Sequence, residues 1–245
     1  MADLDSWALS DFSDGVRTFP VYRKGEGPGV IVVHEIPGIT PSVLGFAQEV
    51  VDAGFTVVLP CLFGRPGVPM TLGYTLGVVG RLCVRSEFTK FGLRRTAPIA
   101  DWLRALARSV HSELGGPGVG ALGMCFTGGF ALAMMADAPV VAPVLAQPSS
   151  PFPVSRAHRA DLNLSPADLA AVKVKAADGC SVLGLRFQGD PAVGTRFDTL
   201  RRELGDNFTA VEFPGRQHST LTEHRQQEGV DRVLAFLRER LPATT

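Results

Sequence analysis

The chain has 245 residues, 45% hydrophobic and 20% charged, and its 24 Lys and Arg residues balance its 24 Asp and Glu residues. This length suits one large domain that buries an adequate core. A net charge of zero leaves no excess of Lys and Arg for binding phosphates. Nucleic acid and membrane surfaces are therefore not expected among its partners.

The four cysteines are too widely spaced for a zinc cluster or a disulfide scaffold; they are Cys61, Cys83, Cys125 and Cys180. The first five residues are acidic where a signal peptide would be basic. No uncharged apolar run reaches the roughly 18 residues that a spanning helix needs. We expect a cytoplasmic protein with reduced thiols and no metal site.

Short apolar runs alternate with helical patterns, which predicts a mostly parallel sheet covered by helices on both faces. Residues 30–33 read as a buried strand, Gly54 ends the helix that follows, and residues 55–59 read as the next strand. Glycines and prolines interrupt residues 60–92, an apolar stretch with no clean period. This segment is expected to be a long loop or a partial lid.

The second half of the chain continues the alternation. A helix begins near Thr96 and stops at residues 115–117, with Arg104 and Arg108 off its apolar face. The later elements are strands 119–124, 140–145, 182–187 and 209–213, helices 126–135 and 196–204, a helix that Ser165 caps ahead of Pro166 and Asp168, and a C-terminal helix with Val230, Val233, Leu234 and Leu237. A polar, proline-rich excursion covers residues 148–155. With no linker or repeat, residues 1–245 are expected to form a single domain.

The densest chemical signal is residues 119–129, a strand that runs into a helix through a glycine-flanked cysteine. The nucleophile of an α/β-hydrolase sits on such a turn, with small neighbours two positions away on each side. Gly123 meets that requirement and Thr127 meets it in part. A helix N-terminus also favours the thiolate form of Cys125. The alternative is a small buried cysteine of the core, which is the reading for the other three cysteines.

A second pattern overlaps this turn, because residues 118–123 match G-x-G-x-x-G. That dinucleotide fingerprint must follow a strand and open a helix. Here the first two glycines precede the strand, so the match is interpreted as accidental.

A cysteine nucleophile needs a base and an orienting carboxylate, which α/β-hydrolases place after later strands. Asp190 follows strand 182–187, and His218 follows strand 209–213 and a short loop. Only His218 combines a strand-end position with the order nucleophile, acid, base; the competing histidines are His34, His111, His158 and His224. The alternative for both residues is a solvated loop position.

Four segments together resemble the dienelactone hydrolase family, over most of the chain from about Gly29 to Leu241. They are residues 34–38 (HEIPG), 123–129 (GMCFTGG), 189–193 (GDPAV) and 213–218 (FPGRQH). The resemblance implies an α/β-hydrolase that opens lactones and related esters through a Cys, Asp, His triad without a cofactor. The implied partner is a small-molecule ester or lactone; the oligomeric state is left open.

Carried over by position, the resemblance makes Cys125 the nucleophile, His218 the base and later acid, and Asp190 the group that orients His218. Glu35 matches the family's extra glutamate, which interacts with the resting thiol and helps to generate thiolate. The backbone N–H groups of Phe126 and Ile36 would form the oxyanion hole.

Two positions differ from the family's usual pattern. Thr127 stands where the family usually has glycine, and Thr222 stands where dienelactone hydrolase has a carboxylate-binding arginine. Arg85 is a candidate to bind a substrate carboxylate instead, with a surface arginine as the alternative. The two threonines also motivate a second hypothesis, a non-catalytic protein that binds a small molecule or a partner in the same cleft.

Overall fold

The computed structural model describes residues 4–82, 86–88, 91–136 and 139–242. All eight strands belong to one sheet with the order β1-β2-β4-β3-β5-β6-β7-β8. The strands are β1 (Ala8–Ser13), β2 (Thr18–Lys24), β3 (Gly29–Val33), β4 (Thr56–Pro60), β5 (Val119–Met124), β6 (Val140–Ala146), β7 (Val182–Phe187) and β8 (Phe208–Phe213). The pairs from β4 through β8 are parallel, whereas β1 pairs antiparallel with β2 and β2 pairs antiparallel with β4. This confirms the predicted α/β architecture.

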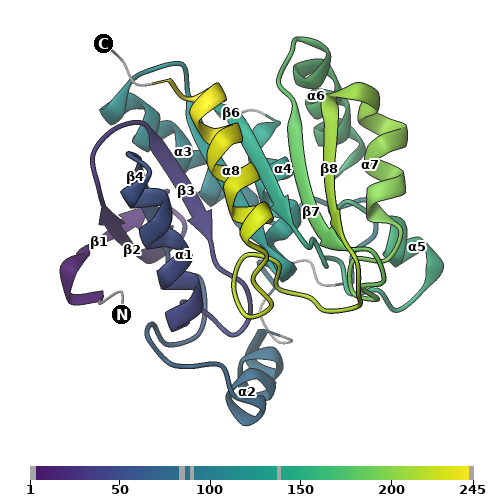
Figure 1. Cartoon of the computed structure of the whole chain (residues 1–245), viewed down its shortest axis with the longest axis horizontal. Helices are drawn as coiled ribbons and strands as arrows, with labels where there is room; N and C mark the ends of the chain where they lie inside the picture. Colours follow the sequence, from purple (N-terminus) through teal and green to yellow (C-terminus); the bar gives the residue numbers. More distant parts are fainter. Residues whose placement is uncertain (1–3, 83–85, 89–90, 137–138, 243–245) are drawn as a thin grey trace.

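Helices cover both faces of the sheet (Figure 1). They are α1 (Pro41–Asp52), α2 (Leu72–Leu82), α3 (Ile99–Leu114), α4 (Gly128–Met135), α5 (Arg156–Ala160), α6 (Pro166–Ala177), α7 (Arg196–Leu204) and α8 (Gln227–Arg240). Short 3₁₀ turns add η1 (Leu4–Ser6), η2 (Cys125–Thr127) and η3 (Gly205–Asn207). Helices α1 and α8 pack with one core cluster, and α3, α4, α6 and α7 pack with the other.

Alternation along the central strands explains the two cores. In β3, Val30 and Val32 face the cluster under α1 and α8, whereas Ile31 and Val33 face the opposite cluster. Successive side chains of a strand point to opposite faces, so a strand that is buried on both sides reads as an unbroken apolar run. This unbroken run is why residues 30–33 could be predicted as a buried strand from the sequence.

Local signals also place the ends of helices. Ser165 caps α6, and its hydroxyl accepts a hydrogen bond from the Asp168 N–H at 3.1 Å, as predicted. Gly54 follows α1 with a φ of +94°, a conformation that glycine adopts without steric cost.

Three features differ from the sequence expectation. Strands β1 and β2 were not foreseen, and β1 is exposed along most of its length, so it lacks the buried face that makes a strand recognisable. Helix α2 lies inside the segment expected to be a loop or partial lid. Its three glycines have open space around their Cα atoms, so they interrupt the apolar pattern without meeting a neighbour.

The third difference is Arg104, which was placed off the apolar face of its helix but is only 7% exposed. Its guanidinium donates to the carbonyl oxygen of Ala133 at 2.7 and 2.9 Å and pairs with Asp168 at 2.8 Å. A partner on another element therefore allows this charge to be buried, and helical spacing alone does not reveal such a partner. Arg108 is exposed, as expected.

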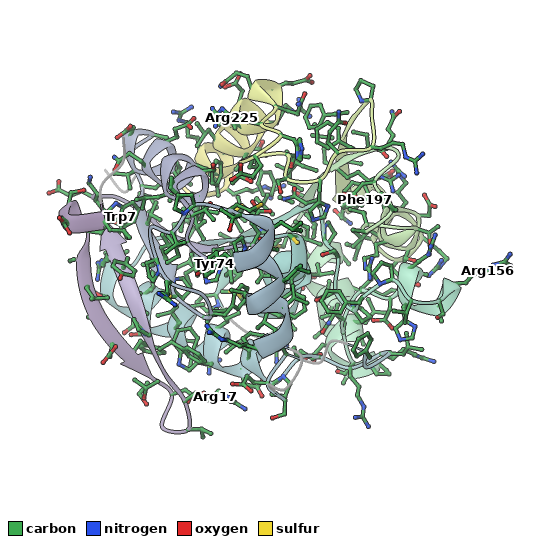
Figure 2. The ribbon with its side chains drawn as sticks, turned by 90° about the horizontal axis from the view of Figure 1, so that it is seen from below. Trp7, Arg17, Tyr74, Arg156, Phe197 and Arg225 are labelled. Atoms are coloured by element: carbon green, nitrogen blue, oxygen red, sulfur yellow. The ribbon has the colours of Figure 1, made fainter. Side chains whose placement is uncertain are left out.

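Helix α2 lies beyond the carboxyl ends of the central strands (Figure 1). Figure 2 looks onto that edge and shows α2, with Tyr74, in front of it. Within the described ranges, no helix combines the length and the apolar character needed to cross a bilayer.

Candidate active site

Cys125 lies on the turn between β5 and α4. Cys125 has a φ of +57°, a left-handed conformation that is uncommon outside glycine, and its side chain is partly buried. A Cβ on Gly123 would lie 2.2 Å from the Thr127 carbonyl oxygen, and one on Gly128 would lie 2.6 Å from Cα of Pro148. Both glycines are therefore required by the close approach of the backbone. The turn presents Cys125 at the carboxyl edge of the sheet, where open α/β sheets build their sites.

The Thr127 side chain joins this turn to the neighbouring strand through hydrogen bonds. Its hydroxyl hydrogen faces the carbonyl oxygens of Val33 and His34, at 3.0 and 3.1 Å, and its oxygen accepts from the Met124 N–H at 3.1 Å. The side chain is fully buried. A threonine at this position thus supplies hydrogen bonds that a glycine cannot, and it joins the Cys125 turn to the segment that carries Glu35.

His218 and Asp190 meet at the same edge. His218 lies in the loop after β8, and Asp190 is the third residue after β7. The Nδ1 atom of His218 is 2.6 Å from Oδ2 of Asp190, whose side chain is only 2% exposed. The other carboxylate oxygen of Asp190 accepts from the Ala192 N–H at 2.9 Å. The aspartate is therefore held from both sides and fixes the plane of the imidazole.

The charge of His218 depends on its two neighbours. Burial lowers the pKa of His218, but the charge of Cys125, the hydrogen bonds with Asp190 and Cys125, and the charge of Asp190 outweigh burial and raise the pKa to about 11. The structure thus brings together Cys125, His218 and Asp190, with the histidine between the thiol and the carboxylate. The arrangement favours the protonated imidazolium form of His218.

Glu35 follows β3 and is 1% exposed. Its carboxylate accepts hydrogen bonds from Ser219 Oγ at 2.7 Å, from Thr222 Oγ1, and from Gln147 Nε2 at 3.5 Å. Burial raises the pKa of Glu35, while the hydrogen bonds from Thr222 and Ser219 and the charge of His218 lower it in part. Glu35 is therefore tied to the loop that carries His218.

Two polar residues after β6 were missed in the sequence. Gln147 is fully buried, with a φ of +36°, and its Oε1 accepts from the backbone and the hydroxyl of Thr220 at 3.2 and 2.7 Å. Ser149 lies beside Cys125, with its Oγ 3.4 Å from the thiol sulfur. Both residues come soon after β6, at the carboxyl edge of the sheet, and this position could have marked them as candidates. The sequence analysis instead treated residues 148–155 as a polar excursion.

The residues predicted to form the oxyanion hole, Phe126 and Ile36, are the chain neighbours of Cys125 and Glu35. Phe126 is the second residue of η2, whose N–H groups begin the helical run of α4, and Ile36 follows Glu35 after β3. Arg85 and Cys83 lie outside the described residues. Among the residues that are described, no group of three or more His, Cys, Asp or Glu could hold a metal ion.

Aromatic side chains pack in the core cluster next to Cys125. The Phe126 ring lies 5.5 Å from that of Phe152 and 6.2 Å from that of Phe63, centroid to centroid. A cavity of about 380 Å³ extends from Phe63 beneath α2. A larger cavity of about 600 Å³ lies among α5, α6 and α7 and is lined by none of Cys125, Asp190 and His218. The chemistry of the side chains, rather than cavity size, therefore locates the site.

His34 has a structural position in this region. It is fully buried, its Nε2 accepts from the Leu62 N–H at 3.1 Å, and its Nδ1 therefore carries the hydrogen that faces the Glu35 carbonyl oxygen at 3.0 Å. Burial lowers the pKa of His34 to about 4, although the hydrogen bond to Glu35 opposes this. The residue is a neutral connector between β3 and the segment after β4.

Acid is expected to destabilise the protein through His34. Below about pH 6.5 an unfolded His34 gains a proton that the folded one resists down to about pH 4, so the free energy of unfolding falls by about 1.4 kcal/mol per pH unit in this window, about 3 kcal/mol in all. Urea unfolding at several pH values should show this slope, and His34→Gln should remove it. The exposed His224 serves as a control, because His224→Gln should leave the slope unchanged. An equal slope in the His34 variant would contradict the assignment.

Comparison with known proteins gives the same fold. The family description "Dienelactone hydrolase family" matches residues 16–231. No curated protein matches the chain. Among solved structures, a cold-adapted esterase from an Arctic intertidal metagenomic library is 18% identical, with a TM-score of 0.62 over 95% of this chain and 93% of that one.

Two further structures are similar over their whole lengths. A dienelactone hydrolase-like promiscuous phosphotriesterase from metagenomic libraries is 19% identical, with a TM-score of 0.61 over 96% of this chain and 98% of that one. An α/β-hydrolase from Penicillium sp. sh18 is 12% identical, with a TM-score of 0.69 over 96% and 99%. These identities show the fold alone. Since the family match extends from residue 16 to residue 231, well over half of the sequence, the chain belongs to the dienelactone hydrolase family.

Proposed function

We propose that this protein hydrolyses small esters or lactones through a thiolate at Cys125. The observation that carries the proposal is the juxtaposition of Cys125, on a glycine-flanked turn with a φ of +57°, and His218, whose other ring nitrogen is 2.6 Å from the buried Asp190. A nucleophile, a base in contact with it, and a group that orients the base form the arrangement required for acyl transfer.

In the first half of the proposed reaction, the Cys125 thiolate attacks the carbonyl carbon and pushes negative charge onto the carbonyl oxygen. The N–H groups of Phe126 and Ile36 would stabilise that oxygen. The carbon–oxygen bond to the alcohol then breaks, and the protonated His218 gives its Nε2 proton to the leaving oxygen. The acyl group remains on Cys125 as a thioester.

In the second half, neutral His218 removes a proton from water, and the resulting hydroxide attacks the thioester. Collapse of the tetrahedral intermediate expels the thiolate, so Cys125 and protonated His218 are restored. Asp190 stabilises the imidazolium in both halves. Water is the only co-reactant, so the reaction needs no cofactor. We also infer a cytoplasmic location, where thiols stay reduced.

Glu35 has a supporting role in this proposal. Its carboxylate lies in the same buried network as the His218 loop and acts as an acceptor that helps to generate the thiolate when substrate arrives. The raised pKa that burial imposes on this carboxyl makes it a better proton acceptor than an exposed glutamate.

The structure weakens the motivation for the non-catalytic alternative. Thr127 and Thr222 were the departures that suggested it. Thr127 fastens the Cys125 turn to Val33 and His34, and Thr222 donates a hydrogen bond to Glu35. Both threonines therefore support the geometry of the site, and this favours a hydrolase.

A panel of aryl esters and lactones tests the proposal. Cys125→Ala is expected to lower kcat/KM by about ten-thousandfold or more, because it removes the sulfur that attacks the carbonyl carbon. Cys61→Ala is the matched control: Cys61 is also partly buried, but burial raises the pKa of its thiol to about 11, so its loss should leave the rate unchanged. Equal rates for wild type and Cys125→Ala would refute the mechanism.

A further inference from the structure

The Cys125 sulfur has a polar neighbour that is not part of the triad. The hydroxyl oxygen of Ser149 lies 3.4 Å from Sγ of Cys125, and the Ser149 N–H donates to the Cys125 carbonyl oxygen at 2.9 Å. Ser149 is 4% exposed, so little water competes for its hydroxyl. Two contacts thus join this residue to Cys125, one of them at the sulfur itself.

The segment that carries Ser149 is held on both sides. Before it, the Gln147 N–H donates to the Leu185 carbonyl oxygen at 2.7 Å. After it, the buried guanidinium of Arg196 donates to the carbonyl oxygens of Ser150, at 3.1 Å, and Pro151. These contacts hold the backbone on both sides of Ser149 and so keep this residue beside Cys125.

The chemistry of the pair depends on the charge of the sulfur. Toward a neutral thiol, a hydroxyl can either donate or accept a weak hydrogen bond. Toward a thiolate it can only donate, and a hydrogen bond to a charged group is the stronger kind. The Ser149 hydroxyl therefore stabilises the thiolate relative to the thiol.

We propose that Ser149 is a further catalytic residue, which donates a hydrogen bond to the Cys125 thiolate. The inference rests on the proposed role of Cys125 as nucleophile. In acylation the sulfur's negative charge moves to the carbonyl oxygen, and the bond from Ser149 weakens. In deacylation the thiolate is the leaving group, and the bond re-forms as the charge returns. Ser149 thus assists the expulsion of the thiolate from the second tetrahedral intermediate.

Alkylation of Cys125 by iodoacetamide tests this directly, because only the thiolate reacts. The rate at Cys125 is followed by mass spectrometry across pH, with Cys61 and Cys180 as internal references. Ser149→Ala should move the midpoint of the rate profile upward by about one pH unit, which corresponds to about 1.4 kcal/mol. It should also lower kcat for ester hydrolysis about tenfold with little change in KM.

The adjacent Ser150 supplies a matched control. It is 1% exposed, and among the described residues its hydroxyl has no hydrogen-bond partner. Ser150→Ala removes the same oxygen from the same buried segment and should leave the midpoint unchanged. Ser149→Thr keeps a hydroxyl and should retain the midpoint of wild type. An unshifted Ser149→Ala profile, or an equal shift in Ser150→Ala, overturns the proposal.

The alkylation rate measures the reactivity of the Cys125 thiolate and does not depend on ester hydrolysis. If the wild type hydrolyses no ester but Ser149→Ala still shifts the midpoint, the proposed function fails while the contact of Ser149 with the thiolate stands. If esters are hydrolysed and the midpoint does not move, the role of Ser149 fails alone. Melting temperatures of the three variants show whether a shift reflects misfolding.

Discussion

Asp190→Asn is expected to lower kcat/KM for aryl esters by about 10³- to 10⁴-fold while the protein stays folded. The carboxylate oxygen 2.6 Å from Nδ1 of His218 requires that Nδ1 carry a hydrogen, which leaves Nε2 to face the thiol. An amide in its place can present N–H groups to Nδ1 and favour the wrong tautomer. The variant also loses the charge that helps to raise the pKa of His218.

The effect should appear in both halves of the reaction, because His218 is the acid in one and the base in the other. Stopped-flow measurement of alcohol release and of steady turnover separates them. Asp198→Asn provides the control, since Asp198 is exposed on α7 and its side chain accepts a hydrogen bond from Arg201. A loss of less than about tenfold in Asp190→Asn would mean that another group orients His218.

The main features of the site could be predicted because the signals for them are local. The turn at Cys125 requires a strand, a small residue two positions earlier and a helix, and all of these lie within residues 119–129. Asp190 and His218 followed from the rule that sites form at the carboxyl ends of parallel strands. The order nucleophile, acid, base and the family resemblance then predicted that these two residues act together.

The supporting contacts could not be predicted, because they join segments that are far apart in the chain. Thr127 contacts Val33 across 94 positions, and Thr222 contacts Glu35 across 187. In sequence both threonines look like departures from a family pattern. Only the folded chain shows that each supplies a hydroxyl to a buried acceptor, and that the position of a missing arginine is used to hold Glu35.

The edge strand β1 and helix α2 could not be predicted from the sequence for a different reason. Strand β1 contributes exposed residues and pairs antiparallel with β2, so neither hydrophobic periodicity nor a βαβ pattern marks it. Helix α2 was obscured by Gly73, Gly77 and Gly80, which lower helix propensity but have open space around them here. Whether α2 acts as a lid stays a prediction.

Glu35→Gln is expected to lower kcat by about a hundredfold to ten-thousandfold, the range of general-base assistance, with a smaller effect on KM. The amide keeps the size of the side chain but cannot accept a proton. It can still accept from Ser219, and the Thr222 hydroxyl can reverse its role and accept from the new N–H₂ group. The His218 loop should therefore stay in place while the proton acceptor is lost.

Thr222→Val separates these two roles of Glu35. It removes one hydrogen bond to the carboxylate but leaves the carboxylate itself, so it should loosen the His218 loop and keep the acceptor. Burial already raises the pKa of Glu35, and the bond from Thr222 lowers it, so Thr222→Val should raise that pKa further and shift the acid limb of the kcat profile upward. Melting temperatures of both variants distinguish lost chemistry from lost stability. If Glu35→Gln hydrolyses esters as fast as wild type from about pH 6 to about pH 9, Glu35 only fastens the loop, and His218 alone activates Cys125.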